Sequence, residues 1–118
     1  TISQIGALAA LGERDHAEAQ KARYAENRRL LNAGLEALGF GAVREPDGAF
    51  YAYVEVSRFT NDSLRFCHEM LEGAGVAAAP GLDFDRTEGN RFIRFSFAGA
   101  RETIEEGLAR MGRWLQGR

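Results

Sequence analysis

One arginine of the sequence stands where a side chain could bind a carboxylate. Arg94 lies between Ile93 and Phe95 in segment 91–98, whose strict alternation of side chains predicts a strand. A guanidinium in such a place needs a partner, because an unpaired buried charge is costly in free energy. Its planar fork matches a carboxylate, which it can hold with two parallel hydrogen bonds. A structural ion pair would satisfy it equally, so the strand alone leaves both interpretations open.

The other reactive side chains lack the neighbours that their chemistry needs. His16 and His68 fall on separate predicted helices without metal-ligand spacing, so ordinary surface or structural histidines are expected. Cys67 lies on the apolar stripe of its helix, where nothing nearby would lower the pKa of the thiol, and a buried, unreactive thiol is expected. Ser96 has no histidine and acid near it in a nucleophile pattern.

Two loop patterns resemble ligand sites only in part. Asp83, Asp85 and Glu88 place three carboxylates within six residues, but the spacing of a calcium loop with its final glutamate is missing. The glycine segments 73–75 and 80–81 lack the following lysine and the strand-to-helix turn of a phosphate-binding loop. We therefore expect no metal site in this sequence.

Composition narrows the class of protein. The 118 residues carry 15 basic and 17 acidic side chains, spread along the sequence, which argues against a nucleic-acid partner. The one basic cluster, residues 21–29, is interleaved with acids and predicts a solvated helix face. No apolar run reaches the roughly 18 residues of a membrane span, so no membrane partner is expected. A single cysteine rules out an intramolecular disulfide and suggests a reduced, cytoplasmic setting.

The elements that must position Arg94 follow from hydrophobic periodicity. Helical spacing predicts a first helix over 2–11 and a long, charge-rich one over 13–38. A third helix follows the capping residues 60–62, with Leu64, Cys67 and Leu71 on its apolar stripe and Phe66 and Met70 beside it. Strands are expected at 49–56, 75–79 and 91–98, with a possible further one at 41–44, and a last helix from 102. This order predicts a two-layer α/β (α+β) fold, a small mixed sheet with helices packed on one side and a long N-terminal helix.

Four segments together carry a family resemblance. QIGALAAL at 4–11, PDGAFY at 46–51, PGLDF at 80–84 and IRFSFA at 93–98 resemble, in order and approximate spacing, the class I/II aminotransferases. These are pyridoxal-phosphate (PLP) enzymes of the aspartate aminotransferase fold, fold type I. The arginine of the family's last segment binds the α-carboxylate of the substrate, and Arg94 stands at that place. The resemblance thus implies Arg94 as a substrate-binding residue.

The resemblance also implies what this sequence lacks. The family uses a lysine that forms a Schiff base with PLP, whereas Lys21, the only lysine here, lies in a charged helix and matches no such context. No catalytic and no cofactor-binding residue is therefore expected within these residues. At 118 residues the sequence fits a single domain, residues 1–118. Because it enters an apolar stretch directly after Thr1, we expect this domain to belong to a longer protein. It would be the C-terminal small domain of a longer chain, inactive alone.

The intact protein, by the same resemblance, would move an amino group between an amino acid and a 2-oxo acid. Family members are usually homodimers, and a homodimer is expected here. Other fold-type I reactions stay open at this point, namely those of β-lyases, decarboxylases and acyltransferases, as do related transcription regulators. A stand-alone binding or interaction module that kept the fold without the chemistry is a further alternative.

Overall fold

The computed structural model of the protein describes residues 1–41, 43 and 45–118. The elements in order are α1 (Ile2–Ala10), α2 (Arg14–Ala37), β1 (Tyr51–Glu55), α3 (Ser63–Ala74), β2 (Ala79–Pro80), the 3-10 helices η1 (Gly81–Asp83) and η2 (Gly89–Arg91), β3 (Phe92–Ser96) and α4 (Arg101–Gln116). The long predicted helix is α2, and each of the other predicted helices is found within a few residues. The further strand considered at 41–44 includes positions 42 and 44 and lies outside the described residues.

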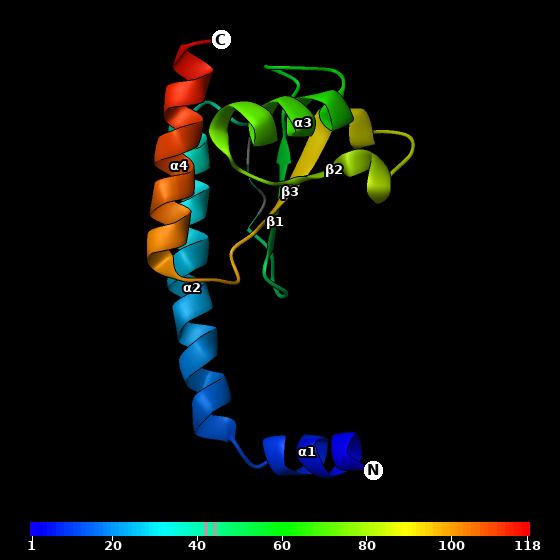
Figure 1. Cartoon of the computed structure of the whole chain (residues 1–118), viewed down its shortest axis with the longest axis vertical. Helices are drawn as coiled ribbons and strands as arrows, with labels where there is room; N and C mark the ends of the chain where they lie inside the picture. The colour runs from blue at the N-terminus through cyan, green and yellow to red at the C-terminus, as the bar shows by residue number, and fades with distance from the viewer. Residues whose placement is uncertain (42, 44) are drawn as a thin grey trace.

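The sheet has three strands in the order β1-β3-β2 (Figure 1). Both pairings are antiparallel: Tyr53 lies opposite Arg94 on one side of β3, and Ala79 lies opposite Arg94 on the other. The expectation of a mixed sheet was wrong. The order strand, helix, strand over β1, α3 and β2 is typical of a parallel pair, but β3 enters between these two strands. Each of them therefore pairs only with a strand that runs the opposite way.

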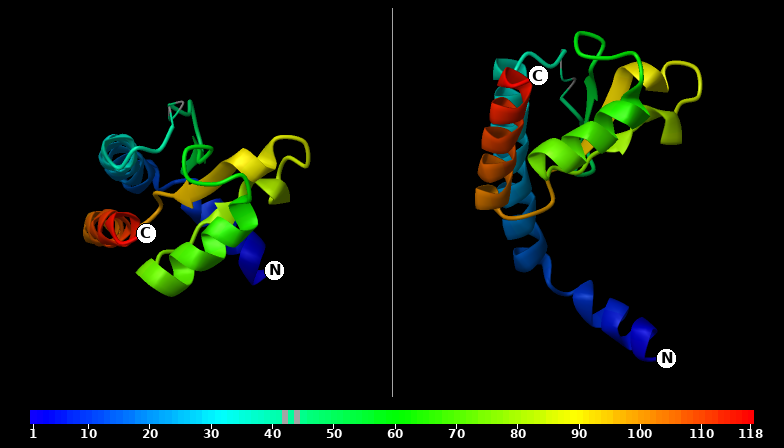
Figure 2. Two further views of the ribbon diagram at one scale, coloured as in Figure 1. Left: turned by 90° about the horizontal axis from the view of Figure 1, so that it is seen from above. Right: turned by 45° about the horizontal axis from the view of Figure 1, so that its top comes forward.

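Helices α2, α3 and α4 cover one face of this sheet, which confirms the two-layer fold (Figures 1 and 2). Alternation along the strands sends Ala52, Val54, Ile93 and Phe95 into the core beneath the helices, where all four are buried. The opposite face carries the side chains that alternate with them, including Arg94. The period of two in the sequence separates Arg94 from Ile93 and Phe95, and the structure places Arg94 on the face away from the core.

The ends of α3 are fixed by local chemistry. Asp62 Oδ1 accepts a hydrogen bond from the Arg65 backbone N–H at 3.1 Å, and Gly75 ends the helix in the left-handed region with φ of 65°.

The apolar stripe predicted for α3 needs a correction. Leu64 and Leu71 are 49% and 51% exposed, whereas the buried face is that of Ser63, Phe66, Cys67, Met70 and Ala74. Helical spacing fits both stripes, and the helix turns its larger apolar side inward.

The long helix α2 has its buried residues in its second half. Asn27, Leu31 and Leu35 are its buried residues. The Asn27 side-chain amide donates hydrogen bonds to the carbonyl oxygens of Phe97 at 3.0 Å and Gly99 at 2.9 Å, so it ties α2 to the segment that follows β3. The first half of α2 leads away from this anchor.

Helix α1 lies at the far end of α2, away from the sheet, as Figure 1 shows at the bottom of the view. None of its residues is buried, and its large apolar side chains are exposed: Ile2, Ile5 and Leu8, followed by Leu11. The molecule is correspondingly elongated, with extents of 49 × 30 × 25 Å. Within the described part of the chain, no helix combines the length and the apolar character needed to cross a membrane.

Candidate functional site

Arg94 lies at the middle of the central strand, on the face that the helices leave uncovered. Its side chain is half-buried. The guanidinium carbon lies 4.0 Å from the centroid of the Tyr51 ring and 4.1 Å from that of the Phe84 ring. Tyr51 comes from β1 and Phe84 from the loop after η1, so two separate elements bring an aromatic ring to the same cation. Both distances fall well inside the range of a cation–π contact.

No acidic side chain of residues 1–41, 43 and 45–118 forms a salt bridge with Arg94. The structural ion pair that the strand pattern left open is therefore absent from this part of the chain. Aromatic rings contact a guanidinium through its faces, whereas carboxylates bind its N–H edge. The arrangement consequently holds the cation without using up the N–H groups that a ligand carboxylate would need.

A close approach of two glycines places Phe84 beside Arg94. A Cβ on Gly81 would lie 2.4 Å from the Gly89 carbonyl oxygen and 2.7 Å from that of Phe92, so backbone occupies the space that any side chain would need. Ser63 Oγ donates a hydrogen bond of 2.8 Å to the same Gly89 oxygen and joins α3 to this contact. The loop that carries Phe84 is therefore pinned from two sides before it reaches the arginine.

The acidic residues of this loop have structural partners. Asp85 Oδ1 accepts hydrogen bonds from the backbone N–H groups of Thr87 at 2.8 Å and Glu88 at 3.2 Å. Glu88 forms a salt bridge of 2.7 Å with Arg91. Among the described residues, no group of three or more His, Cys, Asp or Glu side chains has the geometry to hold a metal ion. The carboxylates of the loop thus shape the turn that precedes β3.

Further aromatic rings extend the surface around Arg94. Tyr53 stacks on Phe92 with ring centroids 4.9 Å apart and planes within 9°, and Phe50 lies against Tyr51 at 4.4 Å. Burial raises the pKa of the Tyr53 hydroxyl, and the negative charge of Asp85 raises it further, so this hydroxyl stays protonated at neutral pH. The Arg94 face therefore places the guanidinium of Arg94 among aromatic rings.

The remaining candidates from the sequence lie away from this arrangement. Cys67 is buried in α3, and burial, with a smaller effect of the Asp83 charge, raises the pKa of its thiol to about 11. That value agrees with the expected unreactive thiol. Both histidines are exposed. Ser96 Oγ accepts a hydrogen bond from the Ala98 backbone N–H at 3.2 Å, as a turn residue does.

The single lysine also fits the solvated helix face that its neighbours predict. Lys21 is exposed on α2 and its Nζ lies 2.6 Å from a carboxylate oxygen of Glu18. It belongs to the half of α2 that has no buried residue, far along the chain from Arg94. Neither its surroundings nor its position suits a lysine that would bind PLP covalently, because such an amine needs a site that lowers its pKa.

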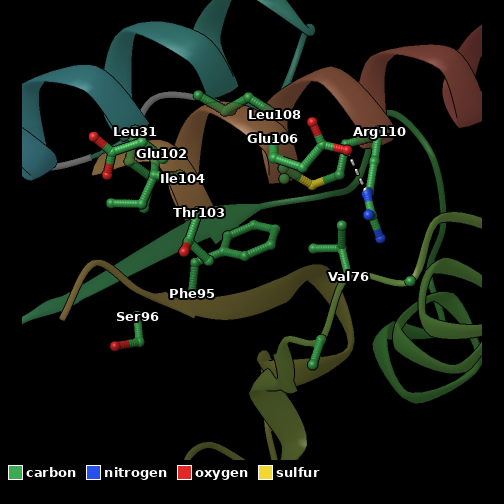
Figure 3. A pocket seen from close by; sticks show the side chains of 14 residues that line it. Leu31, Val76, Phe95, Ser96, Glu102, Thr103, Ile104, Glu106, Leu108 and Arg110 are labelled. Atoms are coloured by element: carbon green, nitrogen blue, oxygen red, sulfur yellow. Dashed lines mark hydrogen bonds and ion pairs between the residues drawn. The ribbon is translucent and has the colours of Figure 1, made fainter. Parts of the chain in front are cut away.

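A cavity of about 550 Å³ lies on the helix side of the sheet (Figure 3). Its lining is mostly apolar and comes from α4, β3 and segment 75–77, with Phe95, Ile104 and Leu108 among the residues labelled. A salt bridge of 2.8 Å between Glu106 and Arg110 crosses one end of it. Arg94 does not line this cavity, because its side chain points to the opposite face of the sheet.

Comparison with known proteins identifies the relatives of this chain. Residues 1–111 match the family described as aminotransferase class I and II. The valine–pyruvate aminotransferase of Mycobacterium tuberculosis is 50% identical over 116 residues, which are 97% of this chain and 30% of that protein. The aspartate/prephenate aminotransferase of Thermus thermophilus is 39% identical over 98% of this chain and 30% of its own length.

Solved structures of aminotransferases resemble this chain in fold as well as in sequence. The crystal structure of an aminotransferase from Mycobacterium tuberculosis superposes with a TM-score of 0.85 at 49% identity, over 88% of this chain and 27% of that one. Thermus thermophilus aspartate aminotransferase with maleate gives a TM-score of 0.76 at 36% identity, over 86% of this chain and 25% of the other. This chain thus spans about 30% of the length of its curated relatives. The chain belongs to the class I and II aminotransferase family.

Proposed function

We propose that this chain is the C-terminal small domain of a longer PLP-dependent aminotransferase, and that Arg94 binds the substrate carboxylate there. The intact protein moves an amino group between an amino acid and a 2-oxo acid. Family membership over residues 1–111 supports the activity, and coverage of about 30% of the relatives supports the assignment as one domain of a longer chain. The observation that carries the proposal is the guanidinium of Arg94, whose carbon lies 4.0 Å and 4.1 Å from the centroids of two rings and which has no acidic partner among the described residues.

Arg94 contributes binding and orientation. A carboxylate that meets the guanidinium edge on accepts two parallel hydrogen bonds, which fix both its position and its plane. The rest of the substrate is then held in one orientation relative to the reacting groups, which lowers the entropic part of the barrier. The adjacent rings cover part of the guanidinium and so reduce the screening of this ion pair by water.

The names of the relatives mention valine, pyruvate and aspartate. These compounds share a carboxylate next to the reacting carbon and differ in the rest of the molecule. The proposal for Arg94 therefore concerns the shared carboxylate.

PLP supplies an electron sink for the bond that is broken at the substrate. The residues of this chain do not fit a covalent anchor for it, because Lys21 is exposed and paired with Glu18. We therefore place the PLP site on other parts of the longer protein and assign no catalytic step to a residue of this chain. A homodimer in the cytoplasm, which the family resemblance and the single cysteine favour, completes the proposal.

The test is made in the full-length protein with Arg94→Ala and Arg94→Lys. We expect Arg94→Ala to raise KM and to lower kcat/KM by an amount equivalent to about 2–5 kcal/mol, or roughly 30- to 5,000-fold. Arg94→Lys keeps the charge but loses the fork, so it should recover only part of the loss. Arg65→Ala, which removes an exposed arginine on α3, serves as the matched control. Kinetics of Arg94→Ala equal to those of the control would show that Arg94 has no role in substrate binding.

The 118-residue chain alone is expected to show no transamination in the presence of PLP. Turnover together with a borohydride-reducible cofactor adduct on Lys21 would contradict this assignment of the PLP site.

A further inference from the structure

We propose that Tyr51 and Phe84 are positioning residues that form an aromatic slot around Arg94 and make it selective for planar carboxylates over tetrahedral oxyanions. This inference rests on the proposed role of Arg94 in binding the substrate carboxylate. It assigns to the two rings a function of their own, beyond shielding the arginine from water.

The two contacts together define the slot. The guanidinium carbon lies 4.0 Å from the Tyr51 ring centroid and 4.1 Å from the Phe84 ring centroid. The rings come from a strand and from a loop, so neither ring owes its place to the other. Phe84 is 52% exposed, which means that its ring covers the arginine without being part of the core.

A guanidinium bound in this way is ordered before any ligand arrives. Arginine has a long side chain with several rotatable bonds, and fixing these bonds at the moment of binding would weaken the complex. Contact with aromatic rings uses the weakly hydrated part of the cation and leaves its N–H groups free. The slot therefore presents a preorganised donor fork to the ligand.

The shape of the anion decides how well it fits. A carboxylate that accepts two hydrogen bonds lies in the plane of the guanidinium, with both oxygens and its carbon in that plane. A sulfonate that makes the same two hydrogen bonds directs its third oxygen and its carbon out of the plane, on opposite sides, so it needs more room above and below that plane than a carboxylate does. Rings that lie about 4 Å from the guanidinium carbon narrow this room. Removing a ring should relieve the crowding.

The loop that carries Phe84 is built to hold the ring in place. Gly81 and Gly89 pack backbone against backbone, and the hydrogen bond of 2.8 Å from Ser63 Oγ to the Gly89 oxygen secures them from α3. Phe84 and Asp85 both donate backbone hydrogen bonds of 2.9 Å to the Gly81 carbonyl oxygen. A ring at the end of such a loop keeps its distance from the arginine better than one on an unsupported segment would.

The experiment measures dissociation constants for two probes of similar size, propionate and ethanesulfonate, by isothermal titration calorimetry on the full-length protein with its cofactor. The wild-type protein should bind propionate more tightly. Phe84→Leu should weaken propionate binding about fivefold, because the donor fork is no longer ordered before the ligand arrives, and should weaken ethanesulfonate binding less, so that the propionate preference falls at least about twofold. Phe84→Tyr restores the ring and should restore the preference. Leu71→Ala, an exposed apolar truncation on α3, is the control.

Tyr51→Leu repeats the test at the second ring, and a thermal melt of each variant confirms that it is folded. If Phe84→Leu and Tyr51→Leu keep the wild-type preference while Arg94→Ala loses propionate binding, the slot is overturned and the proposed function stands. If Arg94→Ala binds propionate as the wild type does, both are overturned. A reduced preference in the two leucine variants, recovered by Phe84→Tyr, supports the slot.

Discussion

Replacement of Asn27 by alanine should destabilise the chain by about 2–4 kcal/mol. The Asn27 amide is buried and donates to two backbone carbonyl oxygens, of Phe97 at 3.0 Å and of Gly99 at 2.9 Å. Each hydrogen bond contributes about 1 kcal/mol net, and a carbonyl left buried without a donor costs about 1–3 kcal/mol. Asn27→Asp should cost at least as much, because a carboxylate of the same shape places negative charge against both carbonyl oxygens.

The measurement is urea unfolding of the 118-residue chain, followed by circular dichroism, with Asn61→Ala as the matched control. Asn61 is exposed, so its truncation should change the free energy of unfolding by no more than about 0.5 kcal/mol. If Asn27→Ala changed the free energy of unfolding as little as the control does, the two hydrogen bonds of Asn27 would not anchor α2 to the segment after β3.

Two further outcomes are expected in the same unfolding assay. Gly81→Ala should destabilise the chain by about 2–3 kcal/mol, since its Cβ would lie 2.4 Å from a backbone oxygen that cannot move aside. The control Gly48→Ala should be close to neutral, because no atom lies within 4 Å of the Cβ position there. Equal effects of the two substitutions would refute the close contact at Gly81. Cys67 should make the free energy of unfolding fall as the pH rises from 9 to 11. The pKa of the thiol is near 9.0 in the unfolded chain and about 11 in the folded one, so unfolding in this range releases a proton. Cys67→Ala should reduce that slope and leave the part due to Tyr53, whose raised pKa acts in the same direction; a slope unchanged from the wild type would contradict the assignment.

The sequence predicted that Arg94 lies on a strand, but it did not predict which aromatic rings contact the Arg94 side chain. Alternation along 91–98 depends only on local geometry, and it separates Arg94 from Ile93 and Phe95, which the structure buries in the core. The contact with Phe84 depends instead on how closely two backbone segments approach around Gly81, which no period in the sequence reports. Strand order is likewise a property of the whole chain, and the insertion of β3 between β1 and β2 could not be inferred from the order of the elements.

Two helix faces show where sequence patterns were ambiguous. On α3, stripes through Leu64 and through Phe66 both satisfy helical spacing, and only packing against the sheet decides between them. On α2, Asn27 lies three residues after Tyr24 and four before Leu31, on the face that turns inward. A polar residue at a core position of a helix is a signal for a buried hydrogen bond, and it was available in the sequence.

The attachment of α2 also has a mechanical consequence. Because Tyr24 is the first residue of this helix that packs against the core, the ten residues before it form an arm about 15 Å long that leads away from the attached half. A tilt of about 10° at Tyr24 would displace the α1 end of this arm by about 2.6 Å. Small changes in the packing of one side chain are therefore amplified at the opposite end of the molecule.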